Sequence, residues 1–483
     1  MVIDALKYQI LQQFGFVPTE EQGQALDAFA RFLTDRDPHA VMILRGSAGT
    51  GKTSLSGAIV RTLKAIRQKV MLLAPTGRAA KVFSLNSGCP AYTIHRRIYR
   101  EKSFAGVDGQ FYLNDNLFTD TLFMVDEASM ISNLGVGGGN FGSGCLLDDL
   151  VRFVYQGHND RLMLIGDKAQ LPPVGEEESP ALNRMMLEGY GLKVYECDLN
   201  EVLRQSQESG ILYNATVIRQ MITHDDITQL PLIRFKGFAD IVMMPGNELV
   251  ESLANSYYRV GQDETMVITR SNKRANIYNN GIRNMVLDRE DELSCGDMLM
   301  IVKNNYFWTE KERNEAKEAL NAIPPFLANG DRAKVLRVSR HMELYGFRFA
   351  TLLLQFPDYD NYEMSVTALL DTLQSEAPAL THEQQEQLFH GVEEDYQDVP
   401  LKADRMKAIR GDQYFNALQV KYAYAITCHK AQGGQWEHVY VDQGYMTDDM
   451  LTPDYIHWLY TAFTRAKDKL FLVNWPKTQT EQA

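Results

Sequence analysis

The chain has 483 residues, a mass of 54.9 kDa and a formal net charge of −13. Hydrophobic residues make up 45% and charged residues 23%, which is typical of a globular protein and excludes disordered and fibrous classes. Its acidity excludes nucleic-acid binding through bulk charge, so any such contact would need a local groove. Five scattered cysteines and no apolar run of membrane-spanning length predict a cytoplasmic protein without disulfides or a membrane partner.

Short apolar runs alternate with helical patterns along the first half of the chain. The runs at 40–44, 70–74, 121–125 and 161–165 are each followed by a polar or glycine-containing motif, and 194–199 precedes another helical stretch. Strands this apolar are buried on both faces, as in a parallel sheet covered by helices. The motifs should therefore meet at the C-terminal edge of one sheet, where α/β folds bind ligands.

Two insertions interrupt this pattern. Residues 101–116 are typical of a β-hairpin, whereas 331–420 changes to alternating strands followed by an acidic, helix-like stretch at 381–395. A second strand–helix region surrounds the later insertion, with strands expected at 265–269 and 422–427. We assign no role to the glycine-rich loop at 135–144.

The segment GSAGTGKT fits the phosphate-binding pattern G-x-x-x-x-G-K-[ST]. Its backbone N–H groups and the N-terminus of the following helix would hold a phosphate chain. Lys52 would reach the β/γ-phosphates and Thr53 would ligate Mg²⁺. The alternative is a strand–helix turn that binds no nucleotide. The predicted nucleotide-binding residues are Gly46, Ser47, Ala48, Gly49, Thr50, Gly51, Lys52 and Thr53.

Two further motifs follow apolar runs. Asp126 and Glu127 stand where a Walker B site is expected: Asp126 can hold Mg²⁺, and Glu127 can orient and deprotonate an attacking water. The segment 166–175, GDKAQLPPVG, places Gln170 near the expected γ-phosphate. A solvated helix start and a rigid capping loop are the respective alternatives.

These motifs, in this order, resemble superfamily 1 DNA helicases, and GDKAQLPPVG is similar to the 1B branch that includes RecD- and Dda-like proteins. Other blocks carry the same resemblance: PTGRAA at 75–80, TIHR at 93–96, LNEVLRQ at 199–205, ITRSNKRAN at 268–276, TCHKAQGGQW at 427–436 and YTAFTRAK at 460–467. The ordered set covers most of the chain.

The resemblance implies an α/β fold of two RecA-like parallel-sheet motor domains with a small β-hairpin "pin" and an SH3-like β-rich insertion. It further implies a monomeric motor that binds ATP and Mg²⁺ between these domains and moves 5′→3′ on single-stranded DNA up to its junction with duplex. The division it implies is 1–95 and 121–225 for motor domain 1A, 96–120 for the pin, 226–330 and 425–483 for motor domain 2A, and 331–424 for the SH3-like insertion 2B.

Several residue roles are implied in the same way. Arg204 and Arg465 resemble arginines that reach the phosphates from opposite sides of the cleft, which makes the catalytic set Lys52, Asp126, Glu127, Gln170, Arg204 and Arg465. Gln22 resembles an adenine-reading glutamine, although Thr19 to Gln22 also fits a helix capping box. Gly433 is placed with the nucleotide contacts. The residues matching the strand channel are Pro75, Thr76, His95, Val174, Asn272, Thr427, His429 and Lys430.

Some alternatives stay open at this stage. Many relatives carry an acidic residue where this chain has Gln435, which puts the nucleotide contacts there in doubt. Phe104 and Phe111 could contact a DNA fork or only pack the hairpin. The sequence does not separate DNA from RNA, nor a helicase from a translocase that unwinds poorly or from a nucleotide-gated binding subunit.

Overall fold

The computed structural model describes residues 2–104, 109–135, 142–201, 208–224, 227–315, 323–324 and 326–481. Its first sheet is entirely parallel, with strand order β3-β2-β6-β7-β1-β8. The strands are β1 (Ala40–Gly46), β2 (Lys69–Ala74), β3 (Ala91–Thr93), β6 (Thr121–Val125), β7 (Arg161–Gly166) and β8 (Lys193–Leu199).

Helices cover both faces of this sheet because its strands are apolar on both sides. In β1, Met42 and Leu44 join one buried cluster with α1 to α3, whereas Val41 and Ile43 join another with α5 and α6. The helices are α1 (Val2–Phe14), α2 (Glu20–Thr34), α3 (Lys52–Ala65), α4 (Gly77–Ser87), α5 (Ile94–Ile98), α6 (Leu146–Gln156) and α7 (Arg184–Gly189), with short turns η1 (Ala128–Met130) and η2 (Pro180–Leu182).

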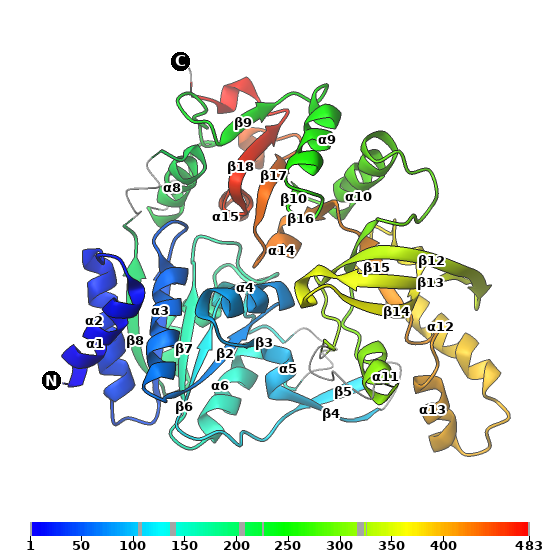
Figure 1. Ribbon diagram of the computed structural model, residues 1–483, viewed down its shortest axis with the longest axis horizontal. Helices are drawn as coiled ribbons and strands as arrows, with labels where there is room; N and C mark the ends of the chain where they lie inside the picture. The colour runs from blue at the N-terminus through cyan, green and yellow to red at the C-terminus, as the bar shows by residue number, and fades with distance from the viewer. Residues whose placement is uncertain are drawn as a thin grey trace.

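A second parallel sheet has the order β16-β10-β17-β18-β9 and lies above the first in Figure 1. Its strands are β9 (Ile241–Met244), β10 (Thr265–Thr269), β16 (Ala425–Thr427), β17 (Trp436–Asp442) and β18 (Ala466–Val473). The neighbouring helices are α8 (Gly210–Thr223), α9 (Leu249–Arg259), α10 (Asn272–Gly281), α14 (Cys428–Ala431) and α15 (Pro453–Phe463), with η4 (Ile282–Val286), η7 (Asp448–Met450) and η8 (Lys477–Gln479). The two sheets confirm the predicted α/β fold with two parallel-sheet motor domains.

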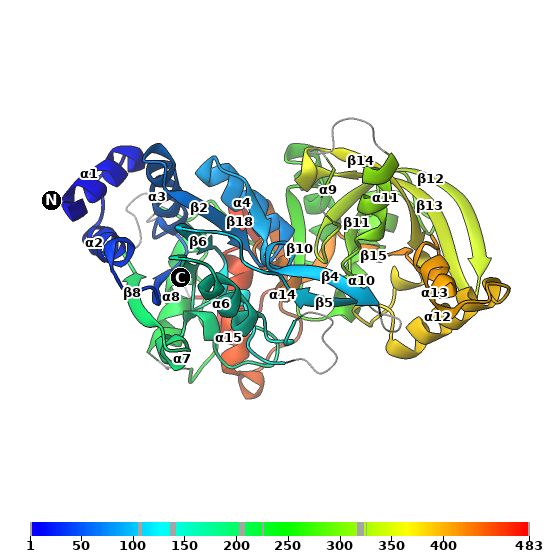
Figure 2. The ribbon, with the colours of Figure 1, turned by 90° about the horizontal axis from the view of Figure 1, so that it is seen from below.

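The hairpin predicted at 101–116 is present as the antiparallel pair β4 (Tyr99–Phe104) and β5 (Gly109–Leu113). It projects from the first motor region toward α11 (Phe307–Glu315) (Figure 2). The Phe111 ring lies 5.0 Å from the Tyr306 ring, so this side chain packs against the region before α11. The turn at 105–108 lies outside the described residues, and the side chain of Phe104 is not described.

Five strands close a barrel at the right of Figure 1. They are β11 (Met298–Ile301), β12 (Arg332–Leu344), β13 (Phe347–Phe356), β14 (Tyr362–Leu369) and β15 (Leu418–Tyr422). Between β14 and β15 the chain forms α12 (His382–Asp395) and α13 (Lys402–Arg410), which pack on Phe347 and Phe349; the turns η5 (Pro357–Tyr359) and η6 (Leu370–Thr372) complete the region. The β-rich insertion is thus observed, but the barrel includes β11, which precedes residue 331.

Packing also bears on where the first motor region ends. The predicted division places α8 with the first motor domain, yet its buried residues Ile211, Ala215 and Ile218 join the core of the second sheet. The division into four domains stays a prediction. Among the described residues, no helix is long and apolar enough to cross a membrane.

Candidate nucleotide site and strand channel

The P-loop connects β1 to α3 through two glycines with left-handed backbone. Gly49 and Gly51 both have φ near 77°, a region that costs glycine little and other residues about 1–2 kcal/mol. Within this turn the Lys52 ammonium donates to the Gly46 carbonyl at 2.8 Å, which folds the lysine back along the loop. The geometry is that of a loop whose N–H groups can surround an anion.

An acidic pair, Asp126 and Glu127, directly follows β6 and lines the same cavity as the P-loop. Glu127 has a left-handed backbone, and its N–H donates to Asp126 Oδ1 at 2.9 Å. Burial and the neighbouring Glu127 charge raise the pKa of Asp126 to about 6, an effect that the Lys52 charge only partly offsets. Glu127 Oε2 is buried with no hydrogen-bond partner among the described residues.

These groups fit a magnesium ion. Two adjacent carboxylates with an unsatisfied oxygen are hard oxygen ligands, and the Thr53 side chain lines the same cavity. In the described part of the chain, no cluster of three or more His, Cys, Asp or Glu side chains could hold a metal. A Mg²⁺ at this position would therefore be held by few protein groups together with substrate phosphates, as this ion commonly is.

The P-loop and the acidic pair line one cavity of about 380 Å³ between the two sheets. From the first sheet's side it also receives Gln170, whose Oε1 is buried without a partner in the described residues. The opposite wall comes from the second motor region. The residues of that wall are Gln435, Thr464, Arg465, Ala466 and Lys467, together with Ser209, Ile211 and Leu212 at the start of α8.

Arg465 is bound to its own domain. Its guanidinium donates to the carbonyls of Thr461 at 3.0 Å and Gly434 at 3.2 Å, and to the Thr464 hydroxyl at 3.1 Å. The side chain lines the cavity while only 2% of the residue is exposed. Arg204, the other predicted arginine, lies outside the described residues.

Gln22 makes the capping box that the sequence offered as an alternative. Its Oε1 accepts from the Thr19 N–H at 3.0 Å, and the Thr19 hydroxyl accepts from the Gln22 N–H at 3.2 Å. The same side chain donates from Nε2 to the Thr50 carbonyl at 2.9 Å. Gln22 therefore supports the P-loop directly, and its contact with adenine stays a prediction.

The loop after β7 is bonded mainly by the second motor region, through contacts that sequence reasoning missed. Tyr460 donates to Asp167 Oδ2 at 2.6 Å and accepts from the Ala48 N–H at 3.0 Å. Leu171 is held from both sides, since its N–H donates to the Thr461 hydroxyl at 2.7 Å and its carbonyl accepts from Gln432 Nε2 at 2.7 Å. The YTAFTRAK motif marked this helix but not these partners.

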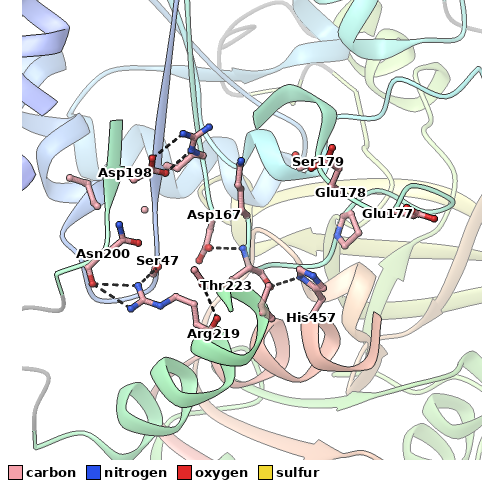
Figure 3. Close-up of a pocket in the computed structure, with 17 residues that line it drawn as sticks. Ser47, Asp167, Glu177, Glu178, Ser179, Asp198, Asn200, Arg219, Thr223 and His457 are labelled. Atoms are coloured by element: carbon pink, nitrogen blue, oxygen red, sulfur yellow. Dashed lines mark hydrogen bonds and ion pairs between the residues drawn. The ribbon is translucent and has the colours of Figure 1, made fainter. Parts of the chain in front are cut away.

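A second cavity, of about 390 Å³, lies on the other side of Ser47 and Asp167 (Figure 3). Arg219 enters it from α8 and donates to the Ser47 hydroxyl at 2.5 Å. His457 lines the same cavity, and its Nδ1 lies 2.9 Å from the Ala169 carbonyl oxygen. Sequence reasoning did not single out Arg219 or His457, because neither lies in a recognisable pattern.

Predicted strand-channel residues come together at one place, where Val174 lies near His429, while Thr76 lies beside Gly433, which was predicted as a nucleotide contact and does not line the nucleotide cavity. Thr76 caps α4 by accepting from the Ala79 N–H at 3.2 Å, and Gly433 packs so closely there that a Cβ would lie 3.1 Å from Thr76 Oγ1. Val174, which is 77% exposed, and His429 line a third cavity of about 400 Å³.

The other predicted strand-channel residues do not form such pairs, and each is described by its own surroundings. Burial lowers the pKa of His95 to about 4, so its ring is neutral near pH 7 and adds no positive charge. Burial also lowers the pKa of Lys430. The Asn272 amide donates to the Glu376 carbonyl at 3.4 Å. Pro75 directly precedes Thr76, the N-cap of α4, and Thr427 is the N-cap of α14.

Residues 19–228 match the AAA domain family, and residues 422–473 match the UvrD-like helicase C-terminal domain. An uncharacterized protein of Methanocaldococcus jannaschii is 34% identical over 171 residues, which are 33% of this chain and 14% of that protein. The ATP-dependent RecD2 DNA helicase of Deinococcus radiodurans is 31% identical over 158 residues, which are 32% of this chain and 18% of that protein. The matched segments thus span less than a fifth of either relative.

A solved structure of a Bacteroides Pif1 helicase in complex with ADP-AlF3 and single-stranded DNA aligns with 97% of this chain and 95% of that chain, at 13% identity and a TM-score of 0.47. The AAA match contains the P-loop and the acidic pair, and the UvrD-like match contains Arg465. Both walls of the cavity therefore lie in matched domains. The chain therefore contains a segment that matches the AAA domain family followed by one that matches the UvrD-like helicase C-terminal domain, and it is similar in part to the RecD2 DNA helicase.

Proposed function

We propose that the protein is an ATP-dependent motor that moves 5′→3′ along single-stranded DNA and unwinds duplex ahead of it. The observation that carries this proposal is the cavity between the two sheets, which has a P-loop and two carboxylates on one wall and Arg465 on the other. A nucleotide bound there would touch both motor regions. Its hydrolysis would then change how they sit against each other, which is what stepping requires.

The residues of the cavity divide the chemistry between them. The P-loop N–H groups and Lys52 bind and orient the phosphates, Glu127 takes a proton from the attacking water, and Gln170 orients that water. A Mg²⁺ held by Thr53 and Asp126 would neutralise phosphate charge. Arg465 would have to leave at least one of its present acceptors to reach a phosphate, which makes hydrolysis depend on domain closure.

The proposed DNA path runs over the C-terminal edges of both sheets, along the strand-channel residues given above. Gly433, which the resemblance places with the nucleotide contacts, packs against Thr76 of this path. The 5′→3′ polarity and the preference for single strand–duplex junctions come from the family resemblance. The relatives named above support ATP and DNA as ligands, since RecD2 is an ATP-dependent DNA helicase and the Bacteroides Pif1 structure contains single-stranded DNA. We also propose that the motor is monomeric and cytoplasmic.

The test compares matched duplexes that carry a 5′ tail, a 3′ tail or no tail, with ATP consumption followed in the same tubes. A parallel set with an RNA tail separates DNA from RNA tracking. We expect DNA-stimulated hydrolysis and strand separation only from the 5′ tail. The Lys52→Ala variant is the matched control for contaminating ATPases.

Each other outcome points to a different activity. Stimulated hydrolysis without separation would favour a translocase, because Phe111 packs on Tyr306 and the hairpin would then serve only as a brace. Binding that responds to ATP without turnover would favour a nucleotide-gated subunit. Separation only from the 3′ tail would contradict the proposed polarity.

A further inference from the structure

Two consecutive P-loop residues are bonded by side chains from outside the first sheet. Arg219 of α8 donates from Nη1 to the Ser47 hydroxyl at 2.5 Å (Figure 3). Tyr460 of α15 accepts from the Ala48 N–H at 3.0 Å. Arg219 also donates to the Asn200 carbonyl at 3.4 Å, so it bridges the P-loop and the end of β8.

The two helices that carry these side chains form one packed unit with the second sheet. Ile211 and Ile218 of α8 are buried in the same core as Ile456 and Leu459 of α15. Tyr460 itself is only 1% exposed, so its hydroxyl is fixed by packing. Both side chains must therefore move with the second motor region when it moves relative to the P-loop.

The Tyr460 hydroxyl makes a second bond that matters for chemistry. It donates to Asp167 Oδ2 at 2.6 Å, and Asp167 begins the loop that carries Gln170. One buried hydroxyl thus bonds both the loop that would bind the phosphates and the loop that would orient the water. Burial and the Asp167 charge raise the pKa of Tyr460 well above its usual value, so the hydroxyl stays a donor.

We propose that Arg219 and Tyr460 form a clamp through which the second motor region positions the P-loop and the Asp167–Leu171 loop for hydrolysis. Both are positioning residues, since they bond atoms of the two loops and neither lines the proposed nucleotide cavity. The proposal rests on the ATPase function proposed above and adds two residues outside the predicted catalytic set. It predicts an effect on turnover that exceeds the effect on nucleotide binding.

The kinetic test measures kcat and KM for ATP with saturating single-stranded DNA. Tyr460→Phe keeps the ring and removes the hydrogen bonds to Ala48 and Asp167. Arg219→Gln keeps a polar side chain but removes the guanidinium that bonds Ser47 and Asn200. We expect each to lower kcat about tenfold while KM changes less than about threefold. The kcat of the double variant should be no more than about threefold below that of the less active single variant, because both side chains hold the P-loop in the same place.

The control variant is Tyr440→Phe. Tyr440 is buried in the same motor region, and its hydroxyl lies 2.7 Å from both the Ser252 and Ser256 hydroxyls of α9, with no bond to the P-loop or to the Asp167–Leu171 loop. It should lower the melting temperature as Tyr460→Phe does but leave kcat and KM within about twofold of wild type. An equal loss of kcat in this control would overturn the clamp, since loss of a buried bond would then suffice.

Amide hydrogen exchange gives a readout that needs no turnover. In protein without nucleotide or DNA, peptides covering 46–51 and 167–171 should exchange at least about threefold faster in Tyr460→Phe than in Tyr440→Phe. Unchanged exchange, unchanged kcat, or a rise in KM alone would each overturn the clamp. A wild-type protein that hydrolyses no ATP would overturn the proposed function, and the exchange comparison would still decide whether the clamp holds the two loops.

Discussion

The two walls of the nucleotide cavity differ in how their polar groups are satisfied. On the first-sheet wall, Glu127 Oε2 and Gln170 Oε1 are buried without partners among the described residues. On the second wall, all three nitrogens of Arg465 donate to nearby acceptors of its own domain. An unsatisfied buried oxygen costs about 1–3 kcal/mol, so the first wall holds acceptors that a bound cation or a water molecule would satisfy.

This difference suggests a division of labour. The first wall offers two oxygens without partners among the described residues, and Lys52 has to leave only the Gly46 carbonyl to meet a phosphate. The second wall must first break bonds within its own domain, so it contributes only when closure compensates that cost. Binding should therefore depend on the first wall, and turnover on both.

Lys52→Ala should give the largest effect. It removes the one ammonium that lies along the P-loop, and we expect hydrolysis to fall at least about 10³-fold while binding of a labelled single-stranded oligonucleotide survives. The measurement is steady-state ATPase activity beside fluorescence anisotropy. Lys64→Ala on the exposed side of α3 is the matched control and should behave as wild type. Normal hydrolysis by Lys52→Ala would show that the nucleotide does not bind at the P-loop wall.

Arg465→Lys comes next and tests the second wall. Lysine keeps the charge but loses the planar fork, so we expect kcat to fall about 10²-fold with little change in the Kd for a non-hydrolysable ATP analogue. Thermal unfolding should be followed too, because three hydrogen bonds are weakened. A large rise in Kd with normal kcat would contradict this division between the walls, since Arg465 would then contribute to binding and not to turnover.

The two walls were also unequally predictable. The P-loop, Asp126 and Glu127 are local patterns, each set directly after an apolar strand, so the parallel sheet brings them together at its C-terminal edge. The bond from Tyr460 to Asp167 joins residues 293 positions apart, and no local pattern encodes it. Arg219 was missed for the same reason.

Element boundaries followed the same rule. The hairpin β4–β5 was predicted because its turn signals are local. The inclusion of β11 in the barrel and the packing of α8 on the second sheet depend on contacts between distant segments. The capping box at Gln22 was readable from four residues, but its bond to Thr50 was not.

Gly433→Ala should have a smaller effect and measures the contact between the walls outside the cavity. Gly433 has φ near 72°, and an added Cβ would lie 3.0 Å from Ala79 Cβ and 3.1 Å from Thr76 Oγ1. Gly88→Ala is the matched control, since Gly88 has φ near 68° with nothing within 4 Å. Backbone strain costs both variants about 1 kcal/mol. Denaturant unfolding should show a further loss of about 1 kcal/mol in Gly433→Ala alone. Equal losses of stability in the two variants would mean that α4 shifts away from the added methyl group at no measurable cost.

A separate, pH-dependent effect concerns Asp331, where the barrel packs against helix α4 beside the first wall. Its carboxylate accepts from the Ala328 N–H and the Tyr359 hydroxyl, both at 2.7 Å, and a Cβ at Gly77 would lie only 2.5 Å from Oδ1. Burial raises the pKa of Asp331 to about 7, although these two hydrogen bonds partly offset the rise. The usual value is about 3.9 in an unfolded chain. The folded state therefore binds the proton more tightly.

Stability from this group should be fully present below about pH 4 and lost as the pH rises to about 7, with a slope of at most about 1.4 kcal/mol per pH unit. Asp331→Asn cannot ionise, so its melting temperature should lack this part of the pH dependence. The measurement is the difference in melting temperature between wild type and variant at pH 5, 6, 7 and 8. We expect the melting temperature of the wild type to fall relative to that of the variant from pH 5 to 7, and the difference to stay constant above pH 7. A constant difference across the series would mean that Asp331 is ionised throughout, so that the barrel adds no pH-dependent term to its contact with α4.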